Sequence, residues 1–209
     1  WISSTGSRRR DVMSRKKAFV LGNGTSRQKI NHHKLKEHGT VYGCNGLYRE
    51  FVPDHLVAVD TKMIIEIAET GYHAKHSVWS NRNKLTEKHH DVKIMEPNKG
   101  WSSGPTALLL ASQHEHKQIF ILGFDYVGIG KDKERVNNVY AGTRNYKKLE
   151  DRATYYGNWQ RQTMMCINQY PRTKYYRVLE TAEDYIPDHL KDLSNLSHIT
   201  IDDFNKIYG

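Results

Sequence analysis

Two glycines flank an asparagine directly after the apolar segment 18–21, and small hydroxyl residues come next. Gly22 and Gly24 lack the Cβ atoms that would keep a ligand away from the backbone. A helix that begins near Thr25 would add its positive dipole end. We therefore predict that backbone N–H groups of this turn face a phosphate, with Gly22, Asn23, Gly24 and Thr25 in the binding site.

Polar residues also follow three other apolar segments. Asn45 follows residues 40–44, Asp60 follows residues 55–59, and Asp125 follows the continuous apolar run 118–124. Such runs are typical of parallel strands that are buried on both faces. In an open parallel sheet, ligands bind outside the carboxyl ends of the strands, at the point where the strand order reverses. The sequence thus predicts that Asn23, Asn45, Asp60 and Asp125 converge on one site.

A second candidate anion site precedes residues 106–113, which are rich in helix formers. Pro105 suits the first turn of a helix, where its missing N–H has no partner to lose. Ser102 or Ser103 would cap this helix, and Gly104 allows close approach of a ligand. We expect Ser102, Ser103 and Gly104 to lie in the nucleotide site.

Residues 126–156 are polar, rich in glycine, asparagine and tyrosine, and without clear periodicity. Long irregular segments within compact domains are usually functional or disordered, and disordered linkers are poor in aromatic residues. We therefore predict that residues 126–156 form a lid over the ligand. We also expect helices at 62–69, at 160–169 and from about Thr200 to residue 207. Strands are expected at 175–179 and near 93–96, and a strand or an irregular segment at 73–79.

The length of 209 residues is enough for one compact α/β domain. We predict a single Rossmann-like domain over residues 13–209, in which a mostly parallel sheet carries helices on both faces. Residues 1–12 contain three arginines but no apolar region, so they do not resemble a secretory signal. We interpret them as a disordered leader upstream of Met13.

The net charge of +9 suits an anionic ligand, but the basic residues are dispersed beyond the first twenty positions. A nucleic-acid partner is therefore not favoured. The two cysteines, Cys44 and Cys166, lack metal-type spacing and indicate free thiols in a reducing, cytoplasmic environment. No apolar stretch approaches the length of a membrane span.

These motifs, with Leu122-Gly-Phe-Asp-Tyr126, Tyr140-Ala141 and Tyr155-Tyr156-Gly157, resemble the small bacterial sialyltransferases that use CMP-sialic acid. The chain also resembles the broader motility-associated and pterin-pyrophosphokinase-like group, collinearly over residues 18–178. The resemblance implies that Asn23 and Asn45 contact the donor nucleotide and its phosphate, and that Asp60 lies near the cytidine. It also implies that Tyr140 and Tyr155 assist the departing phosphate.

The chain departs from this family where the sialyltransferases have their general-base histidine, because Asn158 stands there. An asparagine amide cannot accept the proton of an acceptor hydroxyl, and such assistance is worth about 10²–10⁴-fold in rate. The histidine pairs 32–33, 89–90 and 114/116 are predicted to be solvated surface residues. Tyr140, Tyr155 and Asn158 are the expected catalytic positions.

The favoured hypothesis is a metal-independent, cofactor-free glycosyltransferase-like protein that binds a nucleotide sugar, preferably CMP-linked, and transfers the sugar to an unidentified acceptor. The alternative is a nucleotide-binding protein without transferase activity. A pterin pyrophosphokinase would need Mg²⁺ on Asp60 and Asp125. An NAD enzyme is disfavoured because Arg27 replaces the third glycine and Asn45 the expected acid. A homo-oligomer is left open.

Overall fold

The chain folds around one parallel β-sheet. The computed structural model describes residues 16–209, so the prediction for residues 1–12 lies outside the described residues. Within them the sheet has eight strands in the order β5-β4-β3-β2-β1-β6-β7-β8, and every neighbouring pair is parallel. The strands are β1 Lys17–Leu21, β2 Thr40–Cys44, β3 His55–Val57, β4 Val78–Ser80, β5 Lys93–Ile94, β6 Gln118–Leu122, β7 Lys174–Leu179 and β8 Leu196–Thr200. The predicted α/β class is confirmed.

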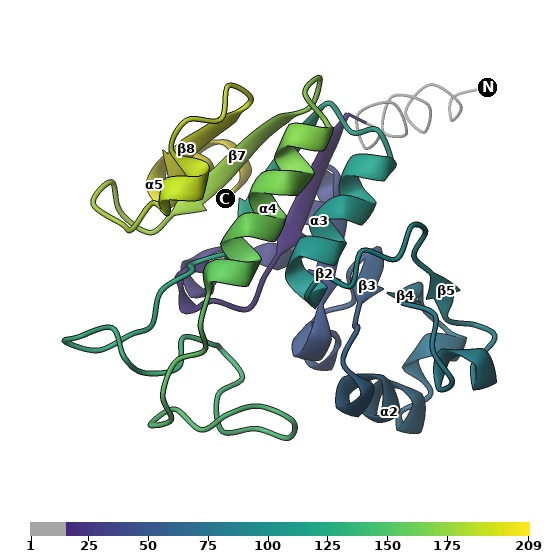
Figure 1. Cartoon of the computed structure of the whole chain (residues 1–209). Coiled ribbons are helices and arrows are strands. Elements are labelled where there is room, and N and C mark those ends of the chain that lie inside the picture. The colour runs from purple at the N-terminus through teal and green to yellow at the C-terminus, as the bar shows by residue number, and fades with distance from the viewer. Residues whose placement is uncertain (1–15) are drawn as a thin grey trace, which may run out of the picture.

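In the described part of the chain, four α-helices cover the two faces of the sheet: α2 Thr61–Glu69, α3 Ser103–Gln113, α4 Gly157–Gln169 and α5 Ile201–Tyr208. Side chains alternate along a strand, so Val20 of β1 packs in the core beneath α3 and α4, while Phe19 packs with α2 and α5. Figure 1 shows α3 and α4 side by side across one face of the sheet. Helices on both faces agree with the predicted Rossmann-like arrangement.

One predicted element differs from the structure: the helix expected near Thr25 is only a five-residue 3₁₀ helix, η1 Thr25–Lys29. The last helix begins at Ile201, after Thr200 accepts a hydrogen bond from the Asp203 N–H at 3.2 Å, which confirms the helix predicted from about Thr200. Segment 73–79 is irregular until β4 begins at Val78, which agrees with the two alternatives predicted for it. Short strands are set by pairing with neighbours, which local sequence does not reveal.

The strand order reverses between β1 and β6. From β1 the chain adds β2, β3, β4 and β5 on one side, and then returns through α3 to place β6 on the other side of β1. The loops after β1 and β6 meet there, since the Gly24 N–H donates to the Gly123 carbonyl at 2.9 Å. Ligands of open α/β sheets bind at such a reversal, outside the carboxyl ends of the strands.

Two further properties bear on the sequence predictions. Across residues 16–209, none of the helices has the length and apolar character that crossing a bilayer requires. Cys44 and Cys166 are both buried free thiols, as predicted. Burial raises the pKa of each thiol to about 12, so both stay protonated and unreactive at neutral pH.

Candidate functional site

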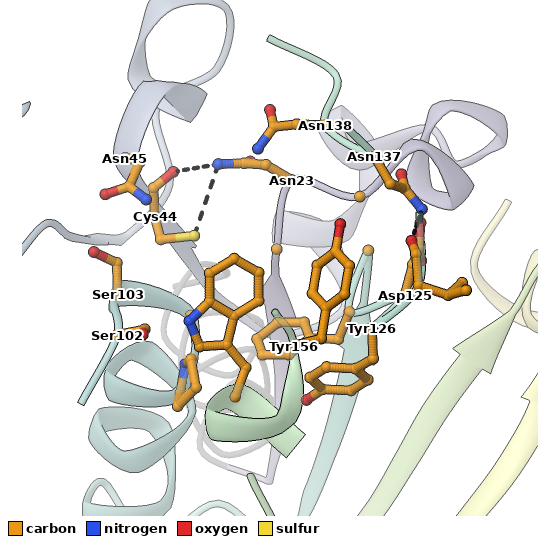
Figure 2. Close-up of a pocket in the computed structure, with 18 of the residues that line it drawn as sticks. Asn23, Cys44, Asn45, Ser102, Ser103, Asp125, Tyr126, Asn137, Asn138 and Tyr156 are labelled. Atoms are coloured by element: carbon orange, nitrogen blue, oxygen red, sulfur yellow. Dashed lines mark hydrogen bonds between the residues drawn. The ribbon is translucent and has the colours of Figure 1, made fainter. Parts of the chain in front are cut away.

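A cavity of about 250 Å³ lies at the carboxyl ends of the central strands, where α3 and α4 begin. Figure 2 shows Ser102 and Ser103 on one side of it and Asp125 and Asn137 on the other. All of the predicted nucleotide-binding residues except Thr25 line this cavity. Its lining is Gly22, Asn23, Gly24, Cys44, Asn45, Asp60, Ser102, Ser103, Gly104, Pro105, Gly123, Phe124, Asp125, Tyr126, Val127, Asn137, Asn138, Tyr156 and Trp159.

Four backbone N–H groups of the first glycine turn donate hydrogen bonds to acceptors within the protein. The bonds run from Gly22 to the Leu122 carbonyl (2.7 Å), from Gly24 to the Gly123 carbonyl (2.9 Å), from Thr25 to Asn137 Oδ1 (2.8 Å) and from Ser26 to Asp125 Oδ2 (3.1 Å). A phosphate would have to break these bonds to reach the donors. Tertiary contacts already satisfy these four donors, so for them the predicted phosphate contact is wrong. The Asn23 N–H has no hydrogen-bond partner among residues 16–209, and for it the prediction stays open.

Asp125 holds this turn in place. Its carboxylate accepts hydrogen bonds from the Ser26 N–H, from the Ser26 hydroxyl and, at 3.1 Å, from Asn137 Nδ2. Asn137 also donates to the Val127 carbonyl at 2.9 Å. Asp125 and Asn137 thus tie the turn after β1 to the long loop after β6.

The start of α3 offers further backbone donors. Ser102 is the N-cap residue, but its side chain makes no capping bond, contrary to the expected cap. The N–H groups of Ser103 and Gly104 begin the helix, where no preceding carbonyl can accept them. Ser103 Oγ accepts from the Val59 N–H at 3.1 Å, which leaves its hydroxyl proton free to donate. Both N–H groups and the helix dipole favour an anion at this end of the cavity.

Hydrogen-bond acceptors gather at the ends of β1, β2 and β3. Asn23 is 8% exposed, and its Nδ2 donates to the Cys44 carbonyl at 3.1 Å, so only its Oδ1 remains. The Oδ1 atoms of Asn23 and Asn45 are both buried without a partner in the described part of the chain. The exposed Asp60 carboxylate likewise has no hydrogen-bond or ion-pair partner among residues 16–209. Buried acceptors without partners are costly, so a ligand with hydroxyl or amine donors fits here.

Aromatic side chains form a further wall of the cavity: Phe124, Tyr126, Tyr156 and Trp159. Tyr156 and Trp159 meet edge to face, with ring centroids 5.2 Å apart. Burial raises the pKa of the Tyr156 hydroxyl, which therefore stays protonated. Aromatic and apolar walls with a few placed polar groups are usual for sites that bind flat heterocycles.

The three predicted catalytic residues lie outside the residues that line the cavity. Tyr140 is buried elsewhere, where its hydroxyl donates to Glu50 Oε1 at 2.6 Å and accepts from Arg27 at 2.8 Å. The Tyr155 side chain is 79% exposed. Asn158, also exposed, accepts from Arg161 at 3.4 Å. Trp159 in the first turn of α4 and its N-cap residue Tyr156 line the cavity, whereas Asn158 points in another direction on the same helix and Tyr155 precedes the helix.

The predicted lid, residues 126–156, contributes Tyr126, Val127, Asn137, Asn138 and Tyr156 to the cavity wall (Figure 2). The Val139 N–H donates to the Asn23 carbonyl at 2.8 Å, and the Tyr146 hydroxyl accepts from the Gly46 N–H at 2.8 Å. Sequence reasoning missed Asn137 and Asn138, and only the adjacent pair of asparagines after Val136 offered a signal for them.

Charged and metal-binding groups are sparse in the cavity. Asp60 and Asp125 are the ionisable carboxylates of the described lining, and no lysine, arginine or histidine belongs to it. The predicted surface position is wrong for His116, which is 5% exposed, whereas His114 is exposed as predicted; both contact the Tyr42 hydroxyl. Among residues 16–209, no group of three or more histidine, cysteine, aspartate or glutamate side chains is arranged to hold a metal ion.

The chain was compared with models of known protein families, with curated proteins and with solved structures, and none of them matches it.

Proposed function

We propose that the protein binds a nucleotide sugar in the cavity at the strand-order reversal. The observation that carries this proposal is that three kinds of binding group line separate parts of one cavity. Unpaired acceptors lie on Asn23 and Asn45, free donors lie at the start of α3, and aromatic rings form the wall between α4 and β6. A nucleoside phosphate presents the complement: sugar hydroxyls and base amines, an anionic group, and a flat ring.

Each part of the proposed ligand is assigned to a part of the cavity. The phosphate lies at the N–H groups of Ser103 and Gly104, with the Ser102 hydroxyl as a further donor. The ribose hydroxyls or the base amine lie at Asn23 and Asn45, whose oxygens only accept. This assignment moves the phosphate away from Asn23, where the family resemblance puts it. The preference for a CMP-linked sugar is supported by that resemblance alone.

Sugar transfer to an acceptor is the enzymatic form of this proposal, and binding without transfer is its alternative. Tyr140, Tyr155 and Asn158 all lie outside the cavity lining, which supports the view that the protein does not copy the sialyltransferase mechanism. Substitution of Asn158→His tests this view. With Asn158 exposed and outside the cavity, we expect no gain in hydrolysis of CMP-sialic acid, whereas a clear gain would show that Asn158 does reach the donor.

Calorimetric titration tests the binding proposal. The Kd values of cytidine, CMP, UMP, GMP, AMP and CMP-sialic acid are compared. A ligand that binds should also stabilise the fold: at about 100 times its Kd it should raise the free energy of unfolding by about 2.7 kcal/mol. CMP should bind more tightly than cytidine, because only CMP reaches the donors of α3. Ser102→Ala should weaken the affinity for CMP by about fivefold, because one hydrogen bond worth about 1 kcal/mol is lost, and should leave the affinity for cytidine unchanged.

The matched control is Ser197→Ala, an exposed serine of β8 far along the sheet from the cavity. It should leave both affinities unchanged. The proposal fails if no nucleotide binds at millimolar concentration, or if cytidine and CMP bind equally and respond equally to Ser102→Ala.

A further inference from the structure

A second cavity, of about 210 Å³, lies beside the first at the ends of β6 and β7. Asp125, Val127 and Asn137 line both cavities, so these three residues form the partition between them. The Asn137 side chain holds that partition together, since it donates to Asp125 and to the Val127 carbonyl. A molecule in one cavity is therefore a direct neighbour of a molecule in the other.

The charges of the second cavity differ from those of a phosphate site. Its lining holds four carboxylates, Asp125, Glu180, Glu183 and Asp184, against two cations, Lys133 and Arg177. The carboxylates therefore outnumber the cations, and an anion is disfavoured there. The phosphates of a nucleotide in the first cavity are therefore not expected to extend into this one.

Arg177 is committed to the protein rather than to a ligand. It is 3% exposed, and it donates to the carbonyls of Phe124 (2.9 Å), Tyr185 (3.0 Å) and Asp125 (3.2 Å). These bonds fix the loop after β6 against the loop after β7. The walls of the second cavity are thus built by a buried side chain and do not depend on a bound molecule.

Groups that recognise hydroxyls remain free in this cavity. Glu183 and Lys133 have no hydrogen bond or ion pair through their side chains in the described residues, and the Tyr185 side chain is 42% exposed. A carboxylate accepts from hydroxyls, an ammonium donates to them, and an aromatic ring packs against the C–H face of a sugar.

We propose that the second cavity binds a neutral, hydroxyl-rich sugar, which is the acceptor toward which the bound nucleotide sugar is directed. The word acceptor rests on the proposed function, whereas the sugar site rests on the second cavity alone. The sugar would lie against Tyr185, with its hydroxyls on Glu183 and Lys133 and its near edge at the Asp125 partition.

Saturation-transfer NMR on the full chain tests this site with methyl β-galactoside, methyl α-glucoside and lactose, and with inorganic phosphate as the anionic probe. At least one glycoside should receive saturation, and phosphate should not compete with it. Glu183→Gln and Tyr185→Ala should each weaken the glycoside by about tenfold and leave CMP affinity unchanged. The matched controls are Glu150→Gln and Tyr155→Ala, which alter exposed residues outside both cavities.

The outcomes separate this proposal from the proposed function. An acceptor site is supported if a glycoside receives saturation, if the Glu183 and Tyr185 variants abolish that saturation, and if CMP binds independently of the glycoside. If the glycoside binds but no nucleotide does, the acceptor role is overturned and the sugar site stands. The sugar site is overturned if no glycoside binds at millimolar concentration, if CMP displaces the glycoside, or if phosphate occupies the site instead.

Discussion

Two glycine-containing segments reach the same cavity, and they differ in what their N–H groups contact. In the turn after β1, the N–H groups of Gly22 and Gly24 are bonded to carbonyls of the β6 end. At the start of α3, those of Ser103 and Gly104 have no preceding carbonyl to meet. A glycine-rich turn after a strand is therefore insufficient for an anion site, because the neighbouring loop decides whether its donors are free.

The glycines themselves play different parts in the two segments. A Cβ atom on Gly24 would collide with the Asp125 carboxylate and lie 2.6 Å from the Gly123 carbonyl. A Cβ atom on Gly104 would meet only the edge of the Phe124 ring, at 3.3 Å. The first glycine allows two backbone segments to pack together, and the second leaves room near the ligand.

Substitution of Gly24→Ala should have the largest effect on stability. The Gly123 carbonyl belongs to the backbone and cannot move cheaply, so we expect a loss of about 1–3 kcal/mol of unfolding free energy. Gly104→Ala is the matched variant and should cost less than about 1 kcal/mol, since alanine is the better helix former. Denaturant unfolding of both measures the difference. Equal losses would mean that the two segments are packed alike.

Substitution of Asn137→Ala tests whether a freed donor is enough to make an anion site. It removes the acceptor of the Thr25 N–H and one donor to Asp125, and should cost about 1–3 kcal/mol of stability. The Thr25 N–H is then free, but the Asp125 carboxylate still faces the turn. We expect no gain in binding of inorganic phosphate by calorimetry; tighter phosphate binding would show that donor occupancy alone kept the turn from being an anion site.

The smallest expected effect is that of Thr25→Ala. The Thr25 hydroxyl donates to Asn137 Oδ1 at 2.9 Å, so its loss should cost about 0.5–1.5 kcal/mol of stability. CMP affinity should not change, because Thr25 lies outside the lining of the first cavity. Ser102→Ala should show the reverse, a weaker affinity for CMP and an unchanged free energy of unfolding. The distinction between the two segments breaks down if both variants lower CMP affinity to the same extent.

The strand ends were predictable because each is marked locally. An apolar run followed by a polar residue predicts where a buried parallel strand stops, and Asn23, Asn45, Asp60 and Asp125 do line one cavity. Pro105 and the helix formers after it likewise predicted α3. These signals depend on residues next to one another in the chain, so no tertiary contact is needed to recognise them.

Local sequence signals could not predict which donors and acceptors already have a hydrogen-bond partner within the protein. The Asn137 side chain accepts a hydrogen bond from the Thr25 N–H, 112 residues away in the chain, and the Asp125 carboxylate accepts one from the Ser26 N–H, 99 residues away. The irregular segment that carries Asn137 has no periodicity from which its path could be inferred. The same holds for Tyr155 and Tyr156, adjacent tyrosines of which only the second lines the cavity.

By itself, then, the amino-acid sequence determined that this chain forms an α/β domain with polar residues collected at one edge of a parallel sheet. Burial of apolar strands and the period of the helices are sufficient for that, because both depend on short-range pattern. The tertiary structure alone decided that the N–H donors of Gly22, Gly24 and Thr25 are taken, whereas those at the start of α3 are not. Hydrogen bonds saturate, and a donor already bonded to a distant loop has nothing left to offer a ligand.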